Sequence, residues 1–326
     1  MTAMTDPAAR SRRWRSADEG PQSAQTARRR RQKVPHRGAI AVLLGPFLVL
    51  FVVFLIVPIF YALVESFQRT ARSGLGLGDA TTTFAGLSNY TRVLGDPDVR
   101  AAIGRVLLFG IIQVPVMLGT ALLMALIFDG GLRWYKKFFQ LTAFLPYAVP
   151  GIIGALIWSF LYVPGLSPIV AAFDNIGITV DFLGPQTVLW SIANISTWSW
   201  TGYNMLIIFA ALQAIPPELT EAGRMDGASQ TRINWSIKIP LVRGAIFLTA
   251  IFSIIGTIQL FSEPTVLRVV ANHNVSAQYT PNMAVYYQAF TVHNPEYASA
   301  IAVCIAVVSF VLSFIVLRAS QRGTDS

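Results

Sequence analysis

The segment Pro216–Gly244, PPELTEAGRMDGASQTRINWSIKIPLVRG, is the longest clearly polar stretch between two apolar spans in the second half of the chain. Its two leading prolines suit the first turn of a helix, where a missing N–H costs nothing. Glu218 and Glu221 add negative charge at the positive end of that helix. The pattern therefore predicts a helix that begins at the prolines and runs to Asp226.

The second half of this segment predicts a turn and another helix. Gly227 permits a sharp bend, residues 230–238 favour a second short helix, and Pro240 is expected to end it as the chain re-enters the membrane. Small or apolar side chains flanked by charges suit docking into a groove on a partner, although a solvated connecting loop is an equally weighted alternative. The side chains expected on the exposed face are Ala222, Met225 and Ala228, with Glu221 and Arg224 beside them.

The composition indicates a membrane protein. Of the 326 residues, 54% are hydrophobic and only 13% are charged, whereas soluble domains average about a quarter charged residues. The single cysteine, Cys304, lies in the last apolar run, which excludes a disulfide framework and a thiolate metal site. The three histidines are scattered without metal-ligand spacing, so no metal site is expected.

A transmembrane helix needs about 20 mainly apolar residues, and this length predicts an all-α polytopic protein with about six spans. After the last span a short tail, residues 319–326, is expected. The expected spans are roughly 39–64, 106–128, 138–163, 188–214, 245–261 and 298–317, within a membrane domain of residues 38–318.

The basic residues predict the orientation. Ten of the 25 Lys and Arg precede residue 38, and residues 1–37 are interpreted as a disordered cytoplasmic tail; a nucleic-acid or lipid-binding arm is the less favoured alternative. With that tail inside, nineteen basic residues fall in inside segments and five in outside loops. Both termini and Pro216–Gly244 are therefore expected in the cytoplasm. Outside, residues 66–104 predict a flexible loop and a short amphipathic helix, and residues 164–187 predict a partly buried re-entrant or capping loop.

Polar and aromatic side chains within the fourth and fifth spans predict a substrate cavity, because such groups usually face a bundle interior. At about 100° per residue one face of the fourth span carries Ser191, Asn194, Trp198 and Thr201, with Trp200 pointing the opposite way. Gln259 and Glu263 share a face of the fifth span. Rings beside amides and hydroxyls suit a sugar. The alternatives are hydrogen bonding between helices and an interfacial belt, or, for Glu263, an exposed acid at the outer edge.

One string resembles a known motif. Glu221-Ala222-Gly223-x-x-Asp226-Gly227-Ala228, followed by Ile237, Ile239 and Pro240, is similar to the EAA loop of permease subunits of binding-protein-dependent ABC importers. The strings ALQAIPPEL, TWSWTGYN, GLSNYTRVL, LPYAVPGIIGALIWSFLY, IQLFSEPTVL and VYYQAF resemble the carbohydrate-uptake branch, of the maltose and glycerol-phosphate type. The resemblance covers about residues 40–318.

The resemblance implies a type I importer permease fold in the inner membrane of a prokaryote and a coupling helix at residues 216–244. Glu221 would pair with a basic group of a cytoplasmic ATPase, Ala222 would allow close approach, and Gly227 would make the bend. Because the chain has no GxxxxGK[ST] loop, it is expected to bind no cofactor; ATP and Mg²⁺ would belong to two copies of the ATPase. The other implied partners are a second permease subunit, an extracytoplasmic binding protein or lipoprotein, and membrane lipid.

The sequence departs from the family pattern at three positions. Gly223 replaces a usual alanine, Asn234 a common aromatic residue, and Gly244 a frequent second proline; a glycine inside the first helix is expected to loosen it by up to ~1 kcal/mol. The rival functions are an importer permease for a non-sugar solute, an ATP-independent channel, and a membrane enzyme or anchor. The resemblance also implies that substrate contacts come from the later spans, in some complexes from only one of two permeases.

Overall fold

The computed structural model describes residues 36–72, 80–130 and 136–322, and it divides into two units, Met1–Pro58 and Ile59–Ser326. Most of the expected basic tail, the Gly-rich part of the first outer loop and the last four residues lie outside the described residues. At the start, α1 (His36–Phe51), a π-helical turn (Val52–Ile56) and α2 (Val57–Ser66) form one apolar helical run that matches the first expected span.

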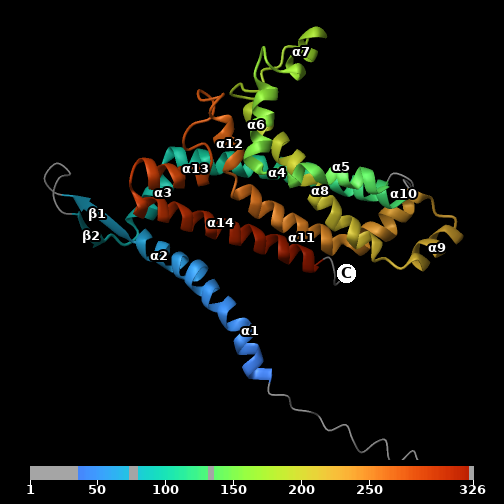
Figure 1. The fold of residues 1–326 in the computed structure, drawn as a ribbon, viewed down its shortest axis with the longest axis horizontal. Helices are drawn as coiled ribbons and strands as arrows, with labels where there is room; N and C mark the ends of the chain where they lie inside the picture. Colours follow the sequence, from blue (N-terminus) through green and yellow to red (C-terminus); the bar gives the residue numbers. More distant parts are fainter. Residues whose placement is uncertain (1–35, 73–79, 131–135, 323–326) are drawn as a thin grey trace, which may run out of the picture. The chain divides into compact units, whose positions relative to one another are not determined.

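In the second unit, four long helices form the body of the fold, α4 (Pro97–Gly130), α8 (Val188–Gln213), α11 (Ile239–Ile258) and α14 (Pro295–Arg322). Helix α4 packs against α8, and α11 packs against α4, α8 and α14, as Figure 1 shows. One apolar core joins α4, α8 and α11 near the end that leads into Pro216–Gly244; its buried side chains are Ala121, Ala125, Phe128, Met205, Ile208, Leu212 and Val242.

The third expected span, residues 138–163, is not one straight helix. It consists of α5 (Lys136–Ala148) and α6 (Gly151–Tyr162), bent by 95° at the break between them. Pro150 stands at this break with an extended ψ of 132°. Proline lacks the N–H that would continue the ladder, and it disfavours helical geometry at the preceding residue. The expectation of a continuous third span is therefore corrected.

The segments expected outside the membrane contain more structure than the sequence predicted. Residues expected as a loop form an antiparallel hairpin of β1 (Gln68–Arg72) and β2 (Ala80–Phe84). The β-branched threonines of the second strand favour this geometry. The expected short amphipathic helix is present as α3 (Ser88–Gly95). The segment 164–187 contains α7 (Pro168–Asn175), and after α11 come α12 (Ser262–Leu267), α13 (Pro281–Tyr286) and a π-helical turn (Tyr287–Thr291).

Polar contacts fasten these outer elements to the long helices. The Asn89 amide donates to the backbone carbonyls of Ser66 and Gln68, at 2.9 and 2.8 Å. Farther along the same region, the Arg105 guanidinium lies 4.6 Å from the Tyr279 ring centroid and its Nε donates to the Tyr279 carbonyl. Burial raises the pKa of the Tyr279 hydroxyl, a shift that the positive charge of Arg105 partly offsets. The loop after α12 is thus held against α4.

Candidate functional site

The segment Pro216–Gly244 begins as the sequence predicts. Helix α9 (Pro217–Met225) has Pro217 in its first turn and Glu218 beside its N-terminus. The turn after α9 contains Gly227, whose φ is +76°, a left-handed conformation that glycine adopts without steric cost. The Ala228 N–H donates to the Gly223 carbonyl at 3.0 Å and closes the turn. The predicted bend at Gly227 is confirmed.

The second arm of the segment differs from the prediction. Ser229 caps α10 (Gln230–Ile233) by accepting from the Arg232 N–H, and a π-helical turn (Asn234–Lys238) leads directly into α11. Pro240 therefore does not end the second helix. The π-helical turn replaces the usual i−4 bond, because the Ile239 N–H donates to the Asn234 carbonyl, and Pro240 then sits in the first turn of α11. The fifth span begins earlier than expected, within one helical run Gln230–Leu267.

Gly223 has a structural reason in this fold. It is the one buried residue of α9, and a Cβ added there would lie 2.9 Å from Ile237 Cδ1 and 3.5 Å from Ile233 Cγ1. The missing side chain lets α9 pack closely on the second arm. We call α9, the Gly227 turn and residues 228–238 the helical hairpin. Glycine at position 223 was expected to loosen α9, but it also allows α9 to lie close to Ile237, a contact that an alanine would disturb.

The hairpin presents a surface of small, apolar and charged side chains. Glu221, Ala222 and Arg224 are exposed, and Met225 is 88% exposed. Asp226, at the C-cap of α9, is also exposed, whereas Ala228 is half-buried. The face expected from the sequence is therefore available to a partner, apart from the partly covered Ala228.

Sequence reasoning missed a polar cluster at the base of the hairpin. Lys238, in the π-helical turn, forms an ion pair with Asp129 near the C-terminal end of α4, and both side chains are about nine-tenths buried. The Gln213 amide at the end of α8 donates to the other oxygen of Asp129 at 2.6 Å. The cluster Asp129–Gln213–Lys238 thus joins the hairpin to two long helices. The only signals in the sequence were that Asp129 is a single acid at the end of one apolar span and that Lys238 is a single lysine before another.

A cavity of about 400 Å³ lies among α4, α8, α11 and the start of α12. Its polar members are amides, hydroxyls and one carboxylate, and its apolar members are mostly aromatic. The lining includes Phe109, Gln113, Met117, Tyr147, Ser196, Ser199, Trp200, Tyr203, Asn204, Phe252, Ser253, Thr257, Gln259, Phe261, Ser262 and Glu263.

The structure brings only part of the predicted cavity together. Gln259 and Glu263 line it, but Asn194, Trp198 and Thr201 do not. The Asn194 amide donates to the Tyr162 hydroxyl at 2.8 Å, and the Thr201 hydroxyl donates to the Thr197 carbonyl. The Asn194 contact matches the alternative of hydrogen bonding between helices, whereas the Thr201 contact lies within α8. The face predicted for α8 is the wrong one.

Trp198 packs in the bundle, and Trp200 faces the cavity. The Trp198 ring meets the Trp158 ring edge-on, with centroids 5.9 Å apart. Trp200 instead forms an aromatic cluster with Tyr147 at 5.3 Å and Tyr203 at 6.0 Å. The signal for this face was present in the sequence as an i, i+3, i+4, i+7, i+8 stripe. That stripe is Ser196, Ser199, Trp200, Tyr203 and Asn204.

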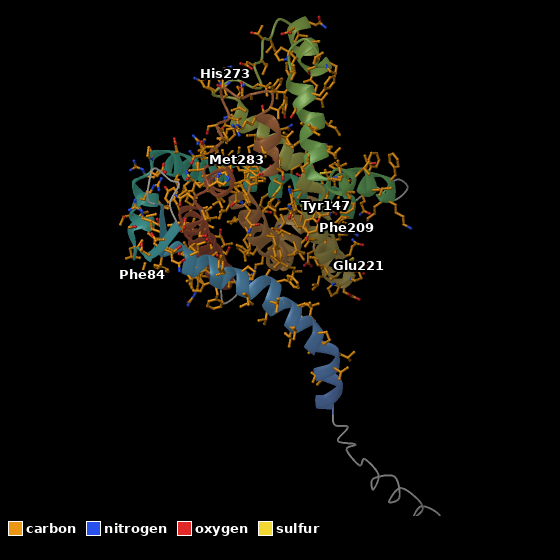
Figure 2. The ribbon with its side chains drawn as sticks, turned by 60° about the vertical axis from the view of Figure 1, so that its left-hand side comes forward. Phe84, Tyr147, Phe209, Glu221, His273 and Met283 are labelled. Carbon is orange, nitrogen blue, oxygen red and sulfur yellow. The ribbon has the colours of Figure 1, made fainter. Side chains whose placement is uncertain are left out.

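The helical hairpin and the loop after α12 lie far apart. Figure 2 shows Glu221 near one end of the second unit and His273 near the other, with Tyr147 at an intermediate height. A cavity flanked by such ends suits passage of a solute through a membrane, with the hairpin available to a partner on one side.

Comparison with known proteins agrees with this architecture. Residues 117–325 match the model of the family described as "Binding-protein-dependent transport system inner membrane component". The sn-glycerol-3-phosphate transport system permease protein UgpA of Agrobacterium fabrum is 31% identical over 224 residues, 68% of this chain and 73% of that protein. The lactose transport system permease protein LacF of Rhizobium radiobacter is 28% identical over 287 residues, 85% and 92% of the two chains.

Among solved structures, a chain of a bacterial ABC transporter involved in the import of the acidic polysaccharide alginate superposes with a TM-score of 0.77. The sequence identity is 18%, and the match covers 89% of this chain and 97% of that one. This likeness concerns the fold alone. The predicted fold class, an all-α polytopic membrane protein of the type I importer kind, is confirmed with the addition of the β1–β2 hairpin.

Proposed function

Because the chain belongs to the family of binding-protein-dependent transport system inner membrane components, we propose that it is a membrane subunit of an ATP-driven importer for a carbohydrate. The cargo class is supported by the curated relatives, whose names include lactose and glycerol-phosphate transport. An oligosaccharide delivered by an extracytoplasmic binding protein is the proposed substrate. A non-sugar solute is the alternative.

The exposed hairpin carries this proposal. Glu221, Ala222 and Met225 form a protruding surface with little contact to the rest of the chain, and a helix with such a face suits a groove on a partner. The partner in the proposal is one of two copies of a cytoplasmic ATPase, which binds ATP and Mg²⁺. A basic group on the ATPase pairs with Glu221, while Ala222 lets the two surfaces approach.

The proposed orientation follows from the hairpin and the charge distribution. The hairpin, both termini and the basic tail face the cytoplasm of a prokaryotic cell, and the chain spans the inner membrane. A second permease subunit completes the translocation path, and the binding protein docks on the outer elements. The chain supplies no nucleotide site, so it acts as a transport subunit and not as an enzyme.

Transport requires two states that the partners favour unequally. In the proposal, ATP-driven closure of the ATPase pair moves the two hairpins of the permease pair. The cluster Asp129–Gln213–Lys238 passes this movement from the hairpin to α4 and α8. Because both helices line the cavity, their displacement changes its access from one side of the membrane to the other.

The test is a charge reversal at Glu221 in the assembled importer. Glu221→Arg is expected to reduce binding-protein-stimulated ATP hydrolysis and uptake at least tenfold, because like charges would oppose at the ATPase groove. Membrane insertion, followed by the amount of full-length chain in washed membranes, is expected to be unchanged, because Glu221 is exposed.

Glu218→Arg is the matched control. It makes the same charge change on an exposed residue one turn earlier in α9, where only a helix-end interaction of about 0.3–1 kcal/mol is lost. Equal loss in both variants would indicate a general charge effect. Normal uptake with Glu221→Arg would contradict coupling through the hairpin and would favour a channel that works without ATP.

A further inference from the structure

The charge of the cavity lining limits which sugars the cavity can accept. Among its lining residues in the described part of the chain, Glu263 is the only ionisable carboxylate, and none is a lysine, an arginine or a histidine. Proteins that hold carboxylates or phosphates usually supply arginine or lysine side chains, or a helix N-terminus. The first turns of α6 and α12 reach the cavity at Gly151 and Ser262, but no basic side chain does, and Glu263 itself stands on the first turn of α12. This chain offers a sugar acid a negative charge and no balancing cation.

Resting on the proposed function, we infer that the cavity accepts uncharged or amino-bearing sugars and that Glu263 excludes uronates and sugar phosphates. Glu263 lies in the first turn of α12, half-buried beside Gln259 and Ser262. Burying a second carboxylate close to it without a counter-ion is strongly unfavourable in a poorly solvated site. An ammonium group of an amino sugar would gain the same interaction with the opposite sign.

The remaining lining matches a neutral sugar. Trp200 and Tyr147 are 43% and 37% exposed, so their rings are open to stacking against C–H faces. Amides and hydroxyls surround them, and these groups both donate and accept hydrogen bonds, as sugar hydroxyls require. The Ser196 hydroxyl is buried with no hydrogen-bond partner among the described residues. Such a group is left for a ligand or a water molecule to satisfy.

The experiment measures direct binding, which separates the cavity from the preference of the binding protein. The full complex of this chain with its partner permease and ATPase is placed in lipid nanodiscs. Quenching of tryptophan fluorescence is then followed with glucose and galactose trisaccharides, with glucuronate and galacturonate trisaccharides, and with the glucosamine trisaccharide. Trp200→Phe identifies the part of the signal that comes from the cavity.

The neutral or amino trisaccharides are expected to bind with a Kd at least roughly tenfold lower than that of the uronates, with the gap narrowing at high salt. Glu263→Gln keeps the shape of the side chain and removes its charge, and it is expected to reduce the gap to less than about threefold. Asp174→Asn is the matched control, because Asp174 is exposed on α7 and does not line the cavity. It is expected to leave the gap unchanged.

Each outcome decides a different claim. Uronates that bind as tightly as neutral sugars would overturn the inference and leave a carbohydrate importer standing. A neutral preference that persists in Glu263→Gln would overturn the role of Glu263. Quenching by no sugar of the panel, in a complex whose ATPase still responds to its binding protein, would contradict the carbohydrate cavity and with it the proposed cargo.

Discussion

Lys238 and Asp129 form a buried ion pair that connects the helical hairpin to the end of α4, and their side chains are 9% and 10% exposed. Gln213 donates to the second carboxylate oxygen of Asp129, so α8 joins the same cluster. Three segments far apart in the sequence therefore meet at one carboxylate. Movement of the hairpin cannot leave α4 and α8 in place without breaking these contacts.

The first prediction concerns this pair. Lys238→Met leaves the Asp129 carboxylate buried without its partner, and loss of one partner of a buried pair costs about 3–5 kcal/mol. We expect a lower unfolding temperature of the complex in detergent and weaker coupling of ATP hydrolysis to uptake. The double variant Asp129→Leu with Lys238→Met replaces the charges by apolar groups and is expected to recover most of the stability.

The double variant also separates stability from coupling. Recovered stability with coupling still impaired would support the cluster as the mechanical link. Full recovery of both would show that any packed contact suffices there. If Lys238→Met alone changes neither quantity, the ion pair has no role in the fold or in coupling.

The second prediction concerns Gly223. Alanine there would place its Cβ 2.9 Å from Ile237 Cδ1, an overlap that requires the isoleucine to shift. We expect Gly223→Ala to weaken coupled ATP hydrolysis by only about twofold, because Cδ1 is the free end of the isoleucine side chain and can rotate aside at small cost. Ile237→Val removes the Cδ1 atom, so the double variant is expected to regain coupling. Rates of ATP hydrolysis with and without the loaded binding protein measure the effect.

Gly244→Ala is the control for helix propensity. A Cβ at Gly244 meets nothing within 4 Å, so this change is expected to be neutral or to stabilise α11 by up to ~1 kcal/mol. A Gly223→Ala variant that behaves like Gly244→Ala would show that α9 does not pack on Ile237 as the structure has it.

The third prediction tests the close approach of α5 and α8. A Cβ at Gly202 would lie 1.9 Å from the Ala143 carbonyl oxygen and 2.9 Å from Phe144 Cα. These are backbone atoms, which no rotamer change can move. Gly202→Ala is therefore expected to separate the helices and to lower the unfolding temperature of the complex, with much less folded protein in the membrane. Gly119→Ala in α4, where a Cβ has open space, is expected to fold normally.

The hairpin shows what local signals in a sequence predict well. Its proline start, an acid at the helix N-terminus and the left-handed Gly227 depend on neighbouring residues alone. The structure has Pro217 and Glu218 in the first turn and the bend at Gly227, whereas Glu221 lies one turn further along. The prediction that the second arm ends at Pro240 was wrong, because the π-helical turn Asn234–Lys238 leads into α11 and Pro240 lies in the first turn of that helix. Such a turn is stabilised by packing against other helices and leaves no clear pattern in the sequence.

The cavity shows what tertiary packing decides. Two faces of α8 carry polar and aromatic groups, and the local pattern does not say which of them turns inward. Asn194 donates a hydrogen bond to the Tyr162 hydroxyl, and the Trp198 ring packs against the Trp158 ring, so neither faces the cavity. It is the packing of α8 against α4, α5, α6 and α11 that turns Trp200 toward the cavity. Gln259 and Glu263 line the cavity, as the sequence predicted; their contact with a substrate stays a prediction.

The last prediction follows from this difference between two tryptophans. Trp200→Ala removes an exposed ring from the cavity lining and is expected to weaken sugar binding by roughly 0.5–1.5 kcal/mol, with little change in unfolding temperature. Trp198→Ala removes a ring that packs on Trp158 and covers Gly154, where an added Cβ would lie 3.3 Å from the Trp198 ring. It is expected to lower stability by about 3 kcal/mol or more and to leave the intrinsic affinity of the folded fraction unchanged.

Sugar affinity per folded complex and the unfolding temperature measure the two effects separately. The reverse result, with affinity lost at Trp198 and stability lost at Trp200, would mean that α8 turns its other face to the cavity when the partner permease is bound.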